Sequence, residues 1–439
     1  MENSFCEKPE RHAPRRLSDH LKLEGQKKKV HSLVDKVYSR KNLHLAWERV
    51  RANHGASGTD GITIEEFEAN LDKNLERLHQ ELRDKTYQAQ PVRRLEIPKR
   101  GAPGKTRPLG IPQVYDRVCQ QAIVNRLEPI FEKVFDPSSF GYRKGRKTSD
   151  ALAKIWREVE AGNEWIVDAD LKDYFGSVDH DRLMTLVAQQ IADSRVLKLI
   201  QQVLKAGYEE QGKRFPTPRG TPQGGVISPL LSNILLTPFD KEMRRKGYRL
   251  TRWADDWVVT CRTRAEAKQV LAQAAKILEK LGVTLNGEKT RIVNIAHGFE
   301  FLGFKIGRGK GRFSISRDKI TSKLNARNLY AIPTQKSVTR FKDQIRTWTK
   351  RKTPLTMGDL IAKINPVIRG WGNYYRRSHV RRRFNQLDQW IIRRLWSHRY
   401  KRWRNTGWKE YSTRRLREEF KLVSLVSLIP SLQTARGHS

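Results

Sequence analysis

Residues 252–261 read RWADDWVVTC and place two adjacent carboxylates, Asp255 and Asp256, between short runs of aromatic and β-branched residues. Such runs are typical of β-strands, so the Asp-Asp pair indicates the turn of a β-hairpin. A second acidic strand end lies earlier in the chain, where Asp170 follows the apolar run WIV in WIVDADLKDYF (165–175). The sequence therefore predicts two strands of one sheet that both end in carboxylates.

Carboxylates at strand ends, with no His or Cys beside them, suit a hard cation such as Mg²⁺. Two such ions about 3.5–4 Å apart stabilise the attacking and leaving oxygens of an in-line phosphoryl displacement. The sequence thus predicts nucleotide addition to a 3′ hydroxyl, with Asp170 and Asp255 bridging the ions and Asp256 assisting or orienting. An ordinary turn would also explain the Asp-Asp pair by itself. Asp168 shares the strand face of Asp170 but lies deeper in the strand, and we leave it out.

The charge of the chain points to a polyanionic partner. The 439 residues carry a formal net charge of +40, from 87 Lys and Arg against 47 Asp and Glu. The segment 301–439 alone holds 34 Lys and Arg against 7 Asp and Glu. Such an excess repels itself unless a polyanion offsets it, and nucleic acid is the expected partner, with binding that weakens as salt rises. A merely solvated surface would not require this concentration.

Composition excludes several other classes of protein. No window is apolar over the roughly 18 residues that a membrane span requires, and the N-terminus lacks the apolar stretch of a secretory signal. The three cysteines, Cys6, Cys119 and Cys261, form no CxxC pair, which argues against a zinc site or a disulfide framework. A reducing cytoplasm is the expected location.

Helix and strand patterns alternate over most of the chain and predict an α+β fold. A helix is expected over 41–53, and Thr63 with Glu66 forms a capping box for a second helix with the apolar stripe Phe67 to Leu82. A hairpin is expected over 92–112, a helix over 116–131, and a Gly-rich loop running into a helix over 220–236. Another helix is expected over 264–281, and beyond about 318 the strand signal fades into helices rich in Arg, Trp and Tyr.

The succession DLKDYFGSVDH, GTPQGGVISPLLSNILL, WADD, LNGEKT and FEFLGFKI resembles the ordered motifs of reverse transcriptases. It most closely resembles the reverse transcriptase/maturase proteins encoded by bacterial group II introns. The resemblance implies a right-hand polymerase, with fingers and an antiparallel-sheet palm over 41–315 and an all-α thumb/maturase domain over 316–405. A basic arm over 1–40 would precede them, and 406–439 would be a short tail, a candidate remnant of a DNA-binding region.

The resemblance also assigns roles to residues around the carboxylates. Asp170, the Leu171 carbonyl, Asp255 and Asp256 match the family's ligands for two Mg²⁺ ions, with Mn²⁺ as a substitute. The matching substrate-binding residues are Phe175 against the sugar of the incoming deoxynucleotide, Gln223 and Gly224 in the loop lining the nucleotide and template, Arg107 and Lys105 at the triphosphate, and Lys289 near the leaving pyrophosphate. The alternatives are a buried core Phe, a tight turn and solvated surface lysines. Trp253 stands where the family commonly has Tyr.

The segment GWGNYYRR (370–377) joins aromatic rings to arginines, a composition suited to folded RNA. We expect RNA contacts from Arg369, Trp371, Tyr375, Arg376 and Arg377, although an ordinary thumb core with a basic face would have the same composition. Longer family members end in a Cys/His-rich HNH endonuclease module. The sequence lacks it, and we expect no DNA nicking. No role follows from the sequence for the apolar tail KLVSLVSLIPSL.

These observations predict an RNA-directed DNA polymerase that also binds its intron RNA and assists splicing and retrohoming. Its expected partners are group II intron RNA, an RNA template with a DNA or RNA primer, a DNA target and dNTPs, in the bacterial cytoplasm at the nucleoid. One alternative is a reverse transcriptase with another role, in phage defence, retroelement diversification or a CRISPR system. Another is a non-catalytic RNA-binding splicing factor.

Overall fold

The computed structural model describes residues 29–98, 104, 106–309, 329–350, 352–400 and 408–430. The chain forms two compact units, residues 1–292 and residues 293–439. Lys105, most of the expected N-terminal arm and the end of the tail lie outside the described residues.

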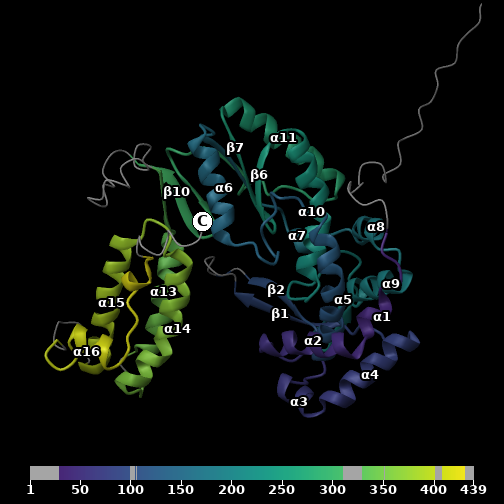
Figure 1. The fold of residues 1–439 in the computed structure, drawn as a ribbon, viewed down its shortest axis with the longest axis horizontal. Coiled ribbons are helices and arrows are strands. Elements are labelled where there is room, and N and C mark those ends of the chain that lie inside the picture. The colour runs from purple at the N-terminus through teal and green to yellow at the C-terminus, as the bar shows by residue number, and fades with distance from the viewer. Residues whose placement is uncertain are drawn as a thin grey trace, which may run out of the picture. The chain divides into compact units, whose positions relative to one another are not determined.

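Helices form the N-terminal part of the first unit, where α1 to α4 gather around α5 (Figure 1). Their bounds are α1 (Val34–Tyr38), α2 (Arg40–Ala52), α3 (Ile64–Ala69), α4 (Leu71–Asp84) and α5 (Val114–Glu132). The predicted capping box is present, because Thr63 accepts from the Glu66 N–H and Glu66 accepts from the Thr63 N–H. The expected single helix is nevertheless two, since the chain leaves helical geometry at Asn70, between α3 and α4.

The predicted hairpin over 92–112 consists of β1 (Val92–Pro98) and β2 (Thr106–Ile111), which pair antiparallel. Two short strands, β4 (Tyr208–Glu210) and β5 (Lys213–Phe215), extend it to a four-stranded sheet in the order β2-β1-β4-β5. This sheet carries Arg107 on β2.

A second four-stranded sheet has the order β6-β7-β3-β8. Its strands are β3 (Trp165–Ala169), β6 (Arg249–Trp253), β7 (Asp256–Cys261) and β8 (Arg291–Asn294). The helices that accompany it are α6 (Thr148–Glu160), α7 (Tyr174–Ser177), α8 (His180–Gln190), α9 (Ser194–Lys205), α10 (Ser228–Arg245) and α11 (Arg264–Lys280). The hairpin over RWADDWVVTC and the helices predicted near 220–236 and 264–281 are confirmed.

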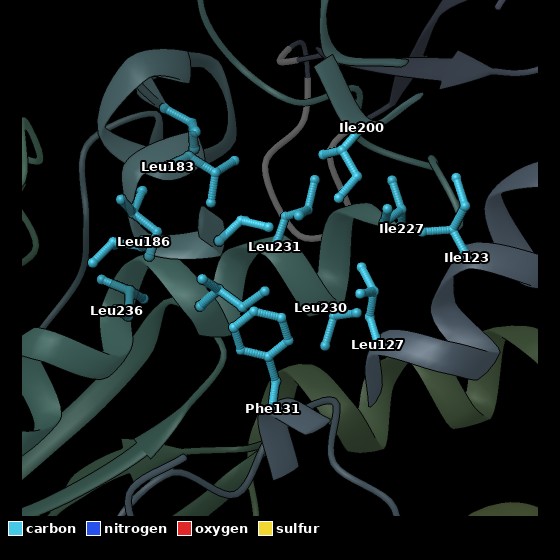
Figure 2. Packing of buried hydrophobic residues seen from close by; sticks show 14 of the residues in the cluster. Ile123, Leu127, Phe131, Leu183, Leu186, Ile200, Ile227, Leu230, Leu231 and Leu236 are labelled. Atoms are coloured by element: carbon cyan, nitrogen blue, oxygen red, sulfur yellow. The ribbon is translucent and has the colours of Figure 1, made fainter. Parts of the chain in front are cut away.

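The apolar core of the first unit includes the region where α5, α8, α9 and α10 meet. Figure 2 shows Leu and Ile side chains from these four helices pointing toward one another, with the ring of Phe131 below them. Leu231, Leu183 and Phe131 are almost fully buried. Each such side chain contributes about 1.5–3 kcal/mol on burial, so this core fixes the helices that carry the loops of the sheet edge.

The second unit combines a three-stranded sheet with helices. Strands β9 (Phe299–Phe301), β10 (Phe304–Arg308) and β11 (Leu329–Pro333) pair antiparallel in the order β11-β10-β9. The helices are α13 (Gln335–Trp348), α14 (Met357–Tyr375), α15 (Arg381–Tyr400) and α16 (Thr413–Glu418), with a 3₁₀ turn η3 (Val426–Leu428). The expectation that strands end before 318 missed β11, a five-residue strand that depends on the edge of β10 for its hydrogen bonds.

The apolar tail is part of the core of this second unit. Leu425 is fully buried, and its N–H donates to Asp388 on α15 over 2.8 Å. Asn365 on α14 donates to the Lys421 carbonyl and accepts from the Val423 N–H, each over 3.0 Å. Within 421–430 the tail therefore holds α14 to α15. In the described ranges, every helix is too short or too polar to span a lipid bilayer.

Candidate active site

The β6–β7 turn presents the predicted carboxylates at one end of the second sheet. Trp253 pairs with Asp256 across the hairpin, which leaves Ala254 and Asp255 as the two turn residues. On its other side β7 pairs antiparallel with β3, with Ala169 opposite Trp257. Asp170 directly follows the last residue of β3, and Asp256 precedes Trp257 as the first residue of β7. The sheet register therefore brings the two predicted acidic strand ends together.

The carboxylates influence one another electrostatically. Burial, together with the neighbouring charges of Asp168, Asp255 and Asp170, raises the pKa of Asp256 to about 8. Burial also raises the pKa of Asp255, and Asp170 again adds to the effect. Three acidic side chains thus lie within electrostatic range of Asp256, and a bound cation would relieve their repulsion. Asp168, left out on the basis of the sequence, is one of them.

Basic residues from the segment 285–291 contact the acidic end of β3. Lys289 Nζ lies 2.5 Å from Asp170 Oδ2, and Arg291 Nε lies 2.9 Å from Asp168 Oδ2. The Asn286 side chain donates to Asp170 over 3.3 Å, and its N–H donates to the Asp170 carbonyl over 2.8 Å. Lys289, assigned from the motif LNGEKT, therefore contacts the carboxylate of Asp170 from a turn in which its own side chain is 53% exposed.

The donor set fits a hard divalent ion. Asp170, Asp255 and Asp256 supply oxygen only, which is the ligand type that Mg²⁺ prefers. In the described part of the chain, no three His, Cys, Asp or Glu side chains form a ready-made metal cage. The Asp170 carboxylate instead forms an ion pair with the ammonium of Lys289. To bind a metal ion, the Asp170 side chain would have to turn from Lys289 toward Asp255 and Asp256.

The Gly-rich loop 220–225 is fastened beside Phe175. The Thr221 N–H donates to the Phe175 carbonyl, and the Gly220 N–H donates to the Val178 carbonyl, each over 2.8 Å. His180, which is buried, has its Nε2 2.7 Å from the Gly220 carbonyl oxygen. Sequence reasoning did not single out His180, which stands three residues after the motif's FGS.

The same loop contacts the first sheet. The Gly110 N–H on β2 donates to the Gln223 carbonyl over 2.8 Å. Gly224 has φ +116°, and a Cβ there would lie 2.5 Å from the Gly110 oxygen, so only glycine fits. Three of the predicted substrate residues, Phe175, Gln223 and Gly224, thus belong to one connected set of loops, and β2, which carries the exposed Arg107, is joined to it.

Phe175 is half-buried, with its ring edge-on to Tyr174 at 5.3 Å between centroids.

Tyr142, which the sequence did not indicate, is 50% exposed and has a left-handed backbone with φ +57°. Burial raises the pKa of Tyr142, Asp255 raises it further, and Arg107 lowers it. The phenol is therefore within electrostatic range of both the β6–β7 turn and β2.

The predicted RNA-contact residues on α14 and just after its end separate into two groups. Tyr375 is buried and its hydroxyl bonds to the Gly303 carbonyl and to Ser337, while Trp371 stacks on Phe341 at 4.6 Å between centroids. Tyr375 therefore belongs to the core, which is the alternative that the composition left open, and the half-buried Trp371 packs against that core. The arginines are more accessible to solvent than the buried Tyr375. Arg369 and Arg377 are exposed, and Arg376 is half-buried.

Exposed cations also line a groove of about 640 Å³ beside the tail. Arg369 comes from α14, Arg417 from α16 and Lys421 from the tail. The acidic residue in the lining, Asp388, is buried and accepts hydrogen bonds from Ser424, Leu425 and Val426. The groove therefore has a positive surface.

Comparison with known proteins agrees with this geometry. Residues 97–306 match the family model described as reverse transcriptase (RNA-dependent DNA polymerase), and residues 338–416 match the group II intron, maturase-specific domain. The group II intron-encoded protein LtrA of Lactococcus lactis is 30% identical over 83% of this chain and 74% of its own length. Protein YkfC of Escherichia coli is 33% identical over 59% of this chain and 78% of its own length.

A more distant relative, an uncharacterized 91 kDa protein in the cob intron of Schizosaccharomyces pombe, is 26% identical over 82% of this chain and 52% of its own length. The reverse transcriptase match includes the carboxylate site, and the maturase match extends from within α13 to within α16. The chain belongs to the group II intron-encoded reverse transcriptases, RNA-directed DNA polymerases that also carry a maturase domain.

Proposed function

We propose that Asp170, Asp255 and Asp256, with the Leu171 carbonyl, hold two Mg²⁺ ions, for which Mn²⁺ can substitute, during DNA synthesis on an RNA template. The register of β3 and β7, which sets Asp170 beside Asp256, is the observation that carries this proposal. When bound, the ions would stabilise the attacking and leaving oxygens of the displacement. The raised pKa values of Asp255 and Asp256 support the proposal, because crowded carboxylates favour a cation.

The surrounding residues bind and orient the nucleotide. The Phe175 ring would fill the space of a 2′ hydroxyl and so select deoxynucleotides. Gln223 and Gly224 would present backbone to the nucleotide and template, and Arg107, with Lys105, would bind the triphosphate. Lys289 supplies a positive charge beside Asp170, where it can stabilise the leaving pyrophosphate.

The second unit is the proposed site of intron RNA binding, and through it of splicing assistance and retrohoming into a DNA target. The exposed Arg369 and Arg377, with Arg376, would contact phosphates, while the buried Tyr375 and the half-buried Trp371 would support the helix. The groove lined by Arg369, Arg417 and Lys421 adds a second phosphate-binding surface. We assign fingers and palm to 41–315, thumb and maturase domain to 316–405, and tail to 406–439, in a protein of the bacterial cytoplasm.

Primer extension on an RNA template with Mg²⁺ and dNTPs tests the proposal. Asp255→Ala should abolish synthesis and leave RNA binding unchanged, because it removes a metal ligand from the sheet edge without touching the second unit. Asp72→Ala, an exposed carboxylate at the start of α4, is the matched control and should retain synthesis. Normal extension by Asp255→Ala would refute the metal assignment. Stimulation of intron splicing, assayed on the same preparations, tests the maturase role separately.

A further inference from the structure

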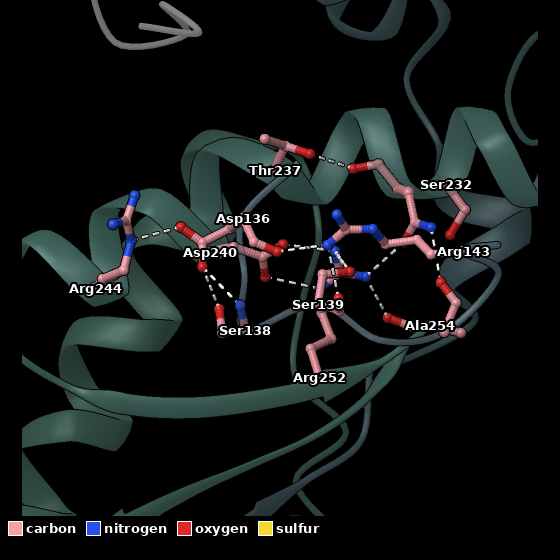
Figure 3. Close-up of polar contacts among 12 residues, drawn as sticks. Asp136, Ser138, Ser139, Arg143, Ser232, Thr237, Asp240, Arg244, Arg252 and Ala254 are labelled. Atoms are coloured by element: carbon pink, nitrogen blue, oxygen red, sulfur yellow. Dashed lines mark hydrogen bonds and ion pairs between the residues drawn. The ribbon is translucent and has the colours of Figure 1, made fainter. Parts of the chain in front are cut away.

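The side chain of Arg252 is fully buried at the base of the carboxylate turn, and each of its five N–H groups has a partner. Nε and Nη2 donate to the two oxygens of Asp240 on α10 over 2.7 and 2.6 Å. Nη1 donates to Asn233 Oδ1 over 3.0 Å and to the Ala254 carbonyl over 2.8 Å. Nη2 also donates to Ser139 Oγ over 2.8 Å. Figure 3 shows Arg252 and Ala254 with Asp240 and Ser139, which come from two other segments of the chain.

The backbone around Arg252 is held by the same segments. Its N–H donates to the Ser138 carbonyl over 2.9 Å, and its carbonyl accepts from the Phe140 N–H over 2.8 Å. The Gly141 backbone lies so close that a Cβ there would be 2.4 Å from the Ala254 nitrogen. Asn233 donates to the Gly141 carbonyl over 2.9 Å. Residues 138–141 and α10 thus pack against the end of β6 and the first residue of the turn.

Ala254 is the residue through which this network acts on the carboxylates. It has φ +59°, a left-handed conformation that a residue with a Cβ adopts only when its surroundings impose it. Its carbonyl, which accepts from Arg252, belongs to the peptide unit that also contains the Asp255 nitrogen. The orientation of this peptide sets the direction in which Asp255 leaves the turn.

We propose that Arg252 is a positioning residue for DNA synthesis, which fixes the Ala254 peptide and thereby aims Asp255 and Asp256 at their shared site. The proposal rests on the metal-binding role proposed for those two aspartates. A buried ion pair is weak evidence for a role in stability, because well-packed apolar residues often replace one at no cost. The five-donor geometry specifies one orientation of the turn, which an apolar pair could not do.

The double variant Arg252→Met/Asp240→Leu separates positioning from stability. It replaces both charges with apolar side chains, so we expect a thermal unfolding midpoint and an RNA affinity close to those of the wild type. The loss of the donor to Ala254 should lower kcat by about 100-fold, the effect of a misplacement of about 1 Å, and raise the Mg²⁺ concentration needed for half-maximal activity. The KM for dNTP should change much less than kcat.

Arg244→Ala is the matched control. Arg244 belongs to the same polar network through a 2.7 Å bond to Asp136 (Figure 3). Its side chain is 62% exposed, and this ion pair joins it to Asp136 rather than to the turn. This variant should keep both kcat and the Mg²⁺ dependence of the wild type.

If the double variant does not fold, Arg252→Lys decides by the same two readouts at a temperature below its own unfolding midpoint. A lysine keeps a charge opposite Asp240, but its single ammonium cannot reproduce the planar fork that also reaches Ala254. Wild-type kcat and Mg²⁺ dependence in a folded Arg252 variant would overturn the inference. Failure of the underlying metal assignment would give a different result, because the Asp255→Ala variant would then extend primers normally.

Discussion

The ammonium of Lys289 lies 2.5 Å from a carboxylate oxygen of Asp170, although the two residues are 119 positions apart in the chain. The contact depends on the segment 284–286, which bonds to Asp170 and Lys172 through backbone and side chain. A turn that the sequence alone would leave on the surface is thereby fixed at the end of β3.

Lys289→Ala should lower kcat for DNA synthesis by about 10²-fold, the cost of removing one group that stabilises developing charge. RNA binding and the unfolding midpoint should stay close to the wild type, because Lys289 is more than half exposed. Steady-state primer extension measures the effect. Lys268→Ala, an exposed lysine on α11, is the control, and equal rates for the two variants would contradict the role of Lys289.

Phe175→Ala should weaken discrimination against ribonucleotides by about 10- to 100-fold, because the missing ring leaves space for a 2′ hydroxyl. The ratio of kcat/KM for dNTP and rNTP on one template is the measurement. Phe175→Tyr keeps the ring and should keep the preference. An unchanged ratio in the alanine variant would assign Phe175 to packing against Tyr174 alone.

Arg417→Ala/Lys421→Ala should weaken intron RNA binding and reduce the slope of log affinity against log salt by about 1.4–1.8, since each of the two lost phosphate contacts removes about 0.7–0.9. Arg414→Ala/Lys409→Ala removes the same charge from outside the groove lining, and Arg414 is 84% exposed on the same helix α16 as Arg417. Titrations at several salt concentrations compare the two pairs. Identical slopes would show that only net charge matters. Extension of a short primer–template should be normal in both.

Asp116 should make the folding stability of the first unit depend on pH. Burial raises the pKa of Asp116 from 3.8 to about 6, so the folded protein binds this proton more tightly than the unfolded chain does. Its contribution is therefore fully present below pH 3.8 and is lost as pH rises through about 6, a change of about 3 kcal/mol at about 1.4 kcal/mol per pKa unit.

Asp116→Asn carries no such proton, so its free energy of unfolding relative to the wild type should rise between pH 4.5 and pH 7.5. Urea unfolding at both values is the measurement. The hydrogen bonds from Tyr87 and Gln90 lower the pKa of Asp116 and so already offset part of the effect of burial. A difference that is constant over the range would contradict the raised pKa.

Local features of the fold could be predicted from the sequence because neighbouring residues determine them. The capping box at Thr63, the β1–β2 hairpin and the Asp-Asp turn all depend on residue types a few positions apart. The break at Asn70 and the strand β11 were missed for the converse reason. The apolar stripe continues through Asn70 without interruption, and β11 is stabilised by pairing with β10 rather than by its own five residues.

The sequence by itself determined the family, the acidic strand ends and the concentration of positive charge, since motifs, spacing and composition are properties of a linear chain. Only the tertiary structure decided which residues meet at the site. The strand order β6-β7-β3-β8 sets Asp170 against Asp256, brings Asp168 and Lys289 to the same edge, and encloses Arg252 between α10 and the turn. Such contacts depend on strand register and helix packing over more than a hundred residues, and no local pattern encodes them.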